Sequence, residues 1–154
     1  MLTINRLREF LSETKEAIPK IKYIQTIVTN DEFVLFLKER KSSDNIMLFG
    51  VVPEHGIIGR EDQTNYQNYL QFFFLDKSAT KDLKQDKKLD IYNNVQLVVK
   101  SFIDLILAAK AGETQAFGNC SLLQQLEEES IEIKTFWDGF ECRGYNVMFN
   151  LYSN

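Results

Sequence analysis

The hydrophobic pattern of residues 86–112 predicts one long helix that lies across a large apolar surface. At 100° per residue, one broad arc of this segment carries most of its apolar side chains: Ile91, Val95, Val98, Val99, Phe102, Ile103, Leu105, Ile106 and Ala109. An aspartate near its start can cap the helix, and Gly112 is a natural stop. Leu97 and Leu107 lie on the polar side, where we expect no intramolecular partner for them.

Two shorter segments also have helical patterns. Residues 3–17 place four side chains on one face, Thr3 can cap the start, and Pro19 ends the helix: Leu7, Phe10, Leu11 and Thr14 form that face. Residues 31–41 fit two structures, because Asp31 can cap a helix or can form a hairpin turn with the preceding asparagine. The charged end of this segment favours the helix.

The remaining patterns predict strands. Residues 20–29 alternate and are rich in β-branched and aromatic side chains. Residues 45–53 and 69–76 are unbroken apolar runs, which are typical of central strands buried on both faces. Residues 130–137 and 142–153 alternate again, and an Asp-Gly turn signal between them predicts a terminal hairpin.

Residues 54–68, between the two buried strands, are expected to form a long exposed loop. The segment contains two glycines, the apolar pair Ile57 and Ile58, and a polar tail that bears Tyr66. A loop of this length inside a compact domain is uncommon and usually has a function.

This order of elements predicts an α+β fold in a single domain, residues 1–154. We expect a mainly antiparallel sheet of four or five strands, with the helices at residues 3–17 and 90–111 on one face. Ser121 and Gln124 form a capping-box pattern for a further short helix, which would end in the acidic residues 127–129.

Composition and charge exclude several classes of protein. With 154 residues, 44% hydrophobic and 26% charged, the chain suits one globular domain and not a disordered one. No apolar run reaches the roughly 18 residues of a membrane span. The net charge of −4 disfavours nucleic-acid binding, which needs a basic face. Cys120 and Cys142 are interpreted as reduced thiols in a cytosolic protein.

The candidate chemical groups do not form a recognisable site. His55 is the only histidine, so two-histidine metal sites are excluded, and its sequence context suggests an exposed turn. Neither cysteine has a base in a recognisable arrangement. The acidic residues 127–129 and Glu132 lack the spacing of a calcium loop and are interpreted as a solvated helix end. We predict no catalytic residue, metal or cofactor.

Several apolar side chains stand in polar surroundings, which indicates a surface covered by another chain. The interface candidates chosen on this basis are Ile57, Ile58, Tyr66, Leu97 and Leu107.

The element order resembles that of the tail-terminator and tail-completion proteins of tailed bacteriophages. The resemblance lies in the first amphipathic helix, the strand KIKYIQTIV, the buried strand NIMLFGVVP and the long sheet-covering helix. It continues in the terminal strand, which starts at Gly144-Tyr145 and contains NVMFNLY. The apparent helix at residues 31–41 and the short acidic, Gln-rich helix depart from the family pattern. The resemblance implies a small α+β domain without catalytic residues, whose first helix and long inter-strand loop contact neighbouring subunits.

The expected function is therefore that of a non-enzymatic structural protein of a phage neck or tail, of the tail-terminator or head–tail joining type. It would form a closed homo-oligomeric ring, a hexamer or a dodecamer, and contact other neck and tail proteins. It would assemble in the bacterial cytoplasm, end in the virion, and bind neither membrane nor specific nucleic acid. The alternative is a cytosolic protein-binding module of the immunity or adaptor type, working as a monomer or dimer.

Overall fold

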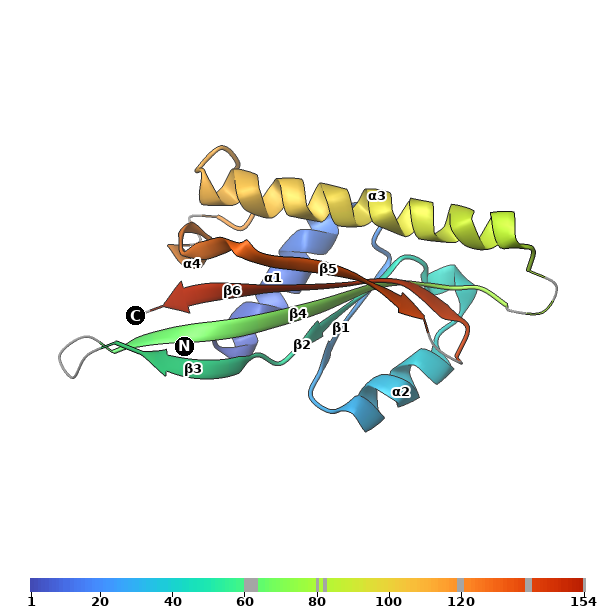
Figure 1. Cartoon of the computed structure of the whole chain (residues 1–154), viewed down its shortest axis with the longest axis horizontal. Helices are drawn as coiled ribbons and strands as arrows, with labels where there is room; N and C mark the ends of the chain where they lie inside the picture. Colours follow the sequence, from blue (N-terminus) through green and yellow to red (C-terminus); the bar gives the residue numbers. More distant parts are fainter. Residues whose placement is uncertain (60–63, 80, 82, 119–120, 138–139, 154) are drawn as a thin grey trace.

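The computed structural model describes residues 1–59, 64–79, 81, 83–118, 121–137 and 140–153 and has an α+β fold, as predicted (Figure 1). Its helices are α1 (Ile4–Ala17), α2 (Asn30–Glu39), α3 (Gln85–Lys110) and the short α4 (Ser121–Gln124). A 3₁₀ turn occupies Ser42–Asp44. The strands are β1 (Tyr23–Ile27), β2 (Met47–Val51), β3 (Glu54–Ile58), β4 (Asn65–Lys77), β5 (Leu126–Trp137) and β6 (Cys142–Ser153).

The six strands form one mostly antiparallel sheet in the order β1-β2-β4-β6-β5. β1 and β2 are parallel, and β3 pairs with the first half of β4, beyond the end of β2. The prediction of four or five strands is wrong, because β3 lies in the segment that was expected to be a loop. Backbone pairing from Glu54 opposite Tyr69 to Ile58 opposite Asn65 forms this strand although its side chains are largely exposed.

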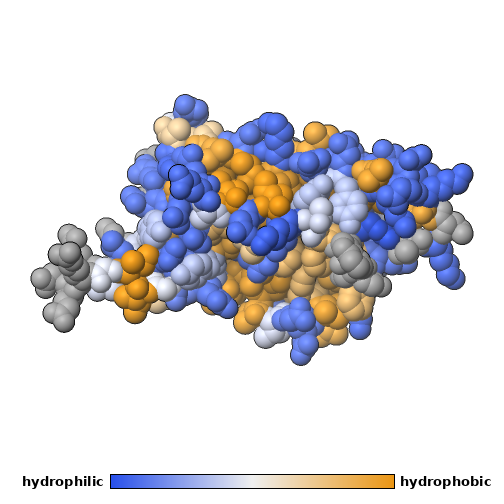
Figure 2. All heavy atoms as spheres, in the orientation of Figure 1, coloured by the Kyte–Doolittle hydropathy of each residue, from blue (hydrophilic) through white to orange (hydrophobic). Residues whose placement is uncertain are grey.

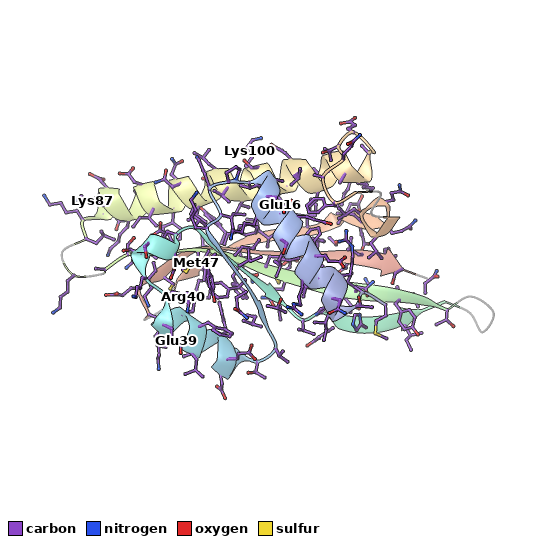
Figure 3. All side chains as sticks on the ribbon, turned by 180° about the vertical axis from the view of Figure 1, so that it is seen from behind. Glu16, Glu39, Arg40, Met47, Lys87 and Lys100 are labelled. Atoms are coloured by element: carbon purple, nitrogen blue, oxygen red, sulfur yellow. The ribbon has the colours of Figure 1, made fainter. Side chains whose placement is uncertain are left out.

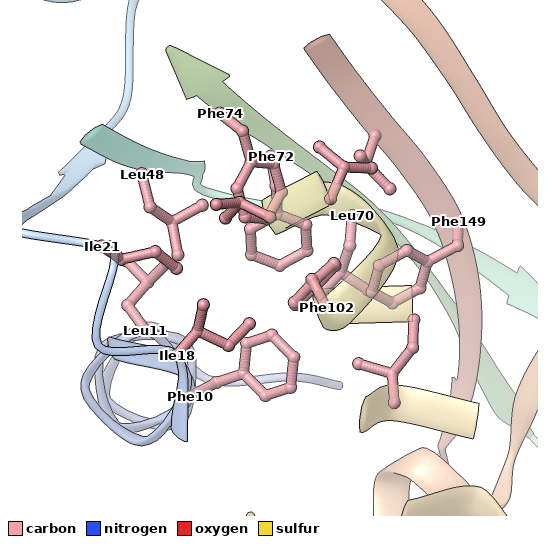
Figure 4. Packing of buried hydrophobic residues seen from close by; sticks show 14 of the residues in the cluster. Phe10, Leu11, Ile18, Ile21, Leu48, Leu70, Phe72, Phe74, Phe102 and Phe149 are labelled. Atoms are coloured by element: carbon pink, nitrogen blue, oxygen red, sulfur yellow. The ribbon is translucent and has the colours of Figure 1, made fainter. Parts of the chain in front are cut away.

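One face of the sheet carries the main core, and α1 and α3 cover it together, as predicted. The buried side chains of α1 are Leu7, Phe10, Leu11 and Thr14. Phe102 of α3 is fully buried between α1 and the strands, with its ring centroid 5.6 Å from Phe72 and 6.0 Å from Phe10 (Figure 4). Phe117, from the segment after α3, is stacked on Phe10 at 4.5 Å.

The opposite face is covered at one end by α2, so the helix interpretation of this segment is confirmed. Phe33 of α2 lies 4.7 Å from Phe73 and 5.2 Å from Phe49, measured between ring centroids. The cap is Thr29 and not Asp31, since the Thr29 side chain accepts a hydrogen bond from the backbone N–H of Glu32 at 3.2 Å. Seen from behind, α2 lies at the end of the molecule away from the β3–β4 hairpin (Figure 3).

α3 is the long helix that the sequence predicts, although no side chain caps its start. Its buried side chains all belong to the predicted apolar arc: Val95, Val98, Val99, Phe102 and Ile106. Among the described residues, it is the one helix with the length and hydropathy of a membrane span. The apolar side of α3 packs against the sheet, and 28% of this apolar window is buried.

The acidic segment before the terminal hairpin was predicted wrongly. α4 ends at Gln124, and β5 begins at Leu126, so residues 127–129 belong to a strand. The pairing of β5 with β6 shifts register between Glu127 and Glu132, which is a β-bulge or similar irregularity. Ser130 bridges it: its hydroxyl donates to the Glu127 carbonyl at 2.6 Å and accepts from the backbone N–H of Asn150 at 2.8 Å. Pairing with β6 therefore overrides the helical propensity of these glutamates.

Candidate functional site

The β3–β4 hairpin projects from the body of the protein (Figure 1). It forms because the N-terminal half of the 13-residue β4 extends past the end of β2 and pairs with β3 instead. In the described part of the chain, no strand pairs with the outer edge of β3. An unpaired edge exposes backbone N–H and C=O groups, and proteins usually protect such edges with lysines, prolines or covering segments. The strand EHGII contains neither lysine nor proline.

The base of the hairpin is fixed by Asn68, which is fully buried. Its Nδ2 group donates to the Leu151 carbonyl at 2.9 Å and to Ser153 Oγ at 3.1 Å. Its Oδ1 atom accepts from the backbone N–H of Leu2 at 2.7 Å and lies 2.9 Å from His55 Nδ1. One amide side chain thus joins β3, β4, β6 and the segment before α1. Sequence reasoning missed this residue, because nothing distinguishes Asn68 from its polar neighbours.

His55 forms a hydrogen bond with the structural residue Asn68. Since Asn68 Oδ1 is an acceptor, His55 Nδ1 carries the proton in this hydrogen bond. The imidazole is exposed and lies on β3, not on the turn that the sequence suggested. No described nucleophile or second ionisable group forms a hydrogen bond with it.

The hairpin presents apolar side chains on both faces of the sheet. Ile57 lies opposite Tyr66 and is 76% exposed, whereas Ile58 lies opposite Asn65 and is 40% exposed. Because side chains alternate along a strand, Ile57 lies on the face of α1 and Ile58 on the opposite face. Tyr66 is half-buried. Figure 2 shows apolar side chains exposed on this projecting part of the molecule.

The two leucines of α3 differ from each other. Leu97 is 47% exposed, as predicted. The prediction that Leu107 has no intramolecular partner is wrong, because it is half-buried and packs against the main core. The prediction placed residues around the helix at 100° intervals and assumed that only the sheet packs against α3. In the structure, α4 also contacts this helix, and apolar side chains of α4 belong to the same core.

A second candidate surface is a groove on the sheet face that α2 leaves uncovered. The groove has a volume of ≈ 620 Å³ and is lined by residues from five of the strands, β2 to β6, and from the segments next to β1 and β2: Val28, Val51, Val52, Glu54, Tyr69, Leu70, Gln71, Ser130, Glu132, Met148, Phe149 and Asn150. Val28 is 64% exposed and Tyr69 is 44% exposed. The sequence did not indicate this groove, because it is assembled from segments that lie far apart along the chain.

The described acidic side chains and the described thiol have different partners and do not form one site. Glu128 pairs with Lys110 at 2.8 Å, and the Glu127 carboxylate accepts from the Tyr152 hydroxyl at 3.0 Å. That hydrogen bond, with a smaller effect of burial, raises the pKa of Tyr152. Cys142 is buried in the core beneath α2, and Cys120 lies outside the described residues. Within the described ranges, no group of three or more His, Cys, Asp or Glu side chains is placed to hold a metal ion.

The described structure therefore offers two surfaces with exposed apolar side chains among polar ones, the projecting hairpin and the open groove. Chemically, these surfaces can bind a protein. No protein-family model matches the sequence, and no curated protein matches it.

Proposed function

We propose that the protein is a non-enzymatic structural subunit that assembles with copies of itself into a closed ring. The observation that carries this proposal is the projecting hairpin, on which the Ile57 side chain is 76% exposed. An apolar side chain at the end of a two-stranded arm gains about 1.5–3 kcal/mol when another chain buries it completely. The unprotected edge of β3 runs along the same arm.

The total surface of the chain supports association. Its accessible surface is 9171 Å². A compact monomer of 18.0 kDa is expected to expose roughly 8,000 Å². The excess, on the order of 1,100 Å², means that the chain exposes more surface than a compact monomer of its mass, as expected for a subunit whose projecting hairpin is covered in an assembly.

The position of the two apolar surfaces favours a ring over a two-fold dimer. A symmetric dimer uses the same patch on both subunits, whereas a ring joins two different patches head to tail. The hairpin arm and the open groove are two such patches, and they lie at different places on the sheet.

The resemblance in element order motivates the biological setting. We propose a place in the neck or tail of a tailed bacteriophage, as a tail terminator or head–tail joining protein, in a ring of six or twelve copies. Other neck and tail proteins would be its partners. Assembly would take place in the bacterial cytoplasm, and the ring would remain in the virion.

The free edge of β3 also fits the alternative, a cytosolic protein-binding module of the immunity or adaptor type. Strand addition to one foreign protein needs one edge and no second patch. Such a protein would be a monomer or dimer by itself.

Negative-stain electron microscopy of the purified protein distinguishes the two proposals. We expect closed rings of identical subunits for the wild type and none for Ile57→Asp, because a carboxylate would be buried without a partner at every contact. Leu35→Asp is the matched control, since Leu35 is 59% exposed on α2, away from both surfaces. Rings in this control and none in the hairpin variant support the proposal. Monomer-sized or dimer-sized wild-type particles at every concentration would overturn it in favour of the binding module.

A further inference from the structure

We propose that the free edge of β1 receives β3 of a second copy, so that one sheet continues from one subunit into the next. This inference rests on the proposed self-assembly and names the surface that meets the hairpin. The two strands run antiparallel, with Gly56 of one copy opposite Gln25 of the other.

Both strands have a free edge without the usual protection. Within the described ranges, β1 pairs with β2 alone and β3 with β4 alone. The Ile27 carbonyl accepts from the backbone N–H of Val52 in the segment after β2, at 2.9 Å. Because backbone groups alternate in direction, those of Thr26 and Ile24 point away from β2. Neither β1 nor β3 contains a lysine or a proline, so both edges are open to a further strand.

The other outer strand of the sheet, β5, is protected against the hairpin. It carries four glutamates, and its pairing with β6 shifts register between Glu127 and Glu132. Charges and bulges on an edge strand oppose the addition of another strand. The hairpin segment 54–68 contains three carboxylates and one arginine, so the glutamates of β5 would repel it. The edge of β1 is the one that fits.

The side chains of β1 and β3 match on both faces of the sheet. Ile24 packs against the main core beneath α1, whereas Tyr23 packs against the cluster beneath α2. In the proposed register, Ile57 meets Ile24 on the face of α1. Ile58 meets Tyr23 on the opposite face. A shift of one residue would turn both isoleucines to the wrong faces, so the pattern specifies this pairing.

An open space next to β1 can receive the Ile57 side chain. It has a volume of ≈ 360 Å³ and is lined by side chains of β1 and α1: Arg8, Leu11, Ser12, Ile24, Gln25 and Thr26. A strand that adds to β1 carries Ile57 into this space, where Ile24 and Leu11 provide apolar contacts. The hairpin residue that is most exposed in the single chain is therefore covered in the pair.

The charges of the two surfaces are complementary. Arg8 lines the space beside β1 and forms no ion pair with another described residue. Lys20 and Lys22 precede β1 and are exposed. In the antiparallel register, the hairpin sequence that follows β3 runs alongside the residues that precede β1. That hairpin sequence contains Glu61 and Asp62, so its carboxylates approach lysines.

This contact joins two different patches, as the proposed ring requires. Each subunit can give its hairpin to one neighbour and its β1 edge to the other, and repetition of the contact closes a ring. Two copies could also exchange hairpins reciprocally and close as a pair with two-fold symmetry. The number of subunits that become linked separates these two closures.

Chemical cross-linking between subunits tests the contact. In a Cys120→Ser background, the double variant Ile57→Cys/Thr26→Cys is treated with a short bis-maleimide and separated on a denaturing gel. In the proposed contact, the two thiols are diagonal neighbours on one face. Within one chain they are about 20 Å apart along the sheet, because their places along β4 are Tyr66 and Phe72. The reagent can therefore join them only between copies.

The gel has distinct outcomes. A ladder of covalent oligomers supports both the contact and the ring. Bands that stop at the covalent dimer support the contact and overturn the ring. Rings seen by microscopy without any cross-link in the folded double variant overturn the strand contact and leave the ring intact. Absence of both rings and cross-links overturns the contact and the proposed function together. Ile57→Cys/Leu35→Cys is the control, since Leu35 is exposed on α2 and should give no ladder.

Thr26→Pro tests the backbone pairing itself. Proline removes the outward N–H of an edge strand and leaves the hydrogen bonds between β1 and β2 in place. In light scattering, we expect this variant to lose the assembled species and to keep a cooperative melting transition. A folded Thr26→Pro variant that assembles as the wild type does would overturn the contact. If the variant does not fold, the cross-linking result decides.

Discussion

Replacing Phe102 with alanine removes the side chain that joins the two helices of the main core to the sheet. The Phe102 ring is fully buried, and its centroid lies 5.0 Å from Phe74, 5.6 Å from Phe72, 6.0 Å from Phe10 and 6.3 Å from Phe149. Alanine would leave a cavity between α1 and the strands, because the four neighbouring rings can only partly move into the vacated space.

The expected loss is about 3–5 kcal/mol in the free energy of unfolding, the usual range for a buried Phe→Ala substitution. Most small domains have a stability of about 5–15 kcal/mol, so the variant should still fold in the cold. For a chain of 154 residues, this loss corresponds to a decrease in Tm of roughly 6–20 °C.

Urea denaturation followed by circular dichroism measures the effect. The comparison is made in the Ile57→Asp background, so that association does not add to the apparent stability. Leu97→Ala is the control, because Leu97 lies on the same helix but is 47% exposed and should change stability by under about 1 kcal/mol. A Phe102→Ala loss as small as that of the control would mean that α3 does not face the sheet as described.

Three further predictions concern stability. Gly144→Ala should destabilise strongly, because Gly144 has φ +157° and an added Cβ would contact the Phe74 carbonyl; thermal melting should show a large decrease in Tm. Asn68→Ala should cost about 1–3 kcal/mol for each buried hydrogen-bonding group that it leaves unpaired, and urea denaturation measures the loss. Burial, partly offset by Arg40, raises the pKa of Tyr23 above its ordinary value of 10.0. As the pH rises, the unfolded chain therefore loses the Tyr23 proton before the folded state does. The contribution of this proton to the free energy of unfolding is complete below pH 10 and decreases as the pH rises further. In Tyr23→Phe, the midpoint of urea denaturation should decrease less between pH 10 and higher pH than it does in the wild type.

The sequence was most informative where periodicity and burial agree. The apolar arc of residues 86–112 and the four-residue face of α1 predicted the side chains that the structure buries. Such patterns are reliable because a side chain's place on a helix depends on its spacing alone. The terminal strand also alternated as predicted, with Val147, Phe149 and Leu151 in the core.

The failures have a common physical cause, which is pairing between distant segments. β3 has almost no apolar alternation, and it becomes a strand because β4 provides its hydrogen-bond partners. The acidic residues after Gln124 enter β5 because β6 lies beside them. Leu107 is half-buried in the main core, which also receives side chains from later segments such as Phe117 and Leu123. None of these partners can be found from a local window of sequence.

Of the two candidate surfaces, one could be found from a local stretch of sequence and the other could not. The exposed pair Ile57 and Ile58 was visible in the sequence, since two large apolar residues stand in a polar segment. The groove on the open sheet face was not, because Val28, Tyr69 and Met148 come together only through the order of the strands.

Light scattering coupled to size-exclusion chromatography tests the central claim most directly, with wild type and Ile57→Asp run side by side. The wild type should elute as one species whose mass is six or twelve times the subunit mass of 18.0 kDa, as the proposed ring requires. Ile57→Asp should have the mass of a monomer, 18.0 kDa. It should keep the circular dichroism spectrum and cooperative melting of the wild type, because Ile57 is 76% exposed in the folded chain. A wild type with the mass of one or two subunits at every concentration, or a variant that assembles as the wild type does, would contradict ring assembly through the hairpin.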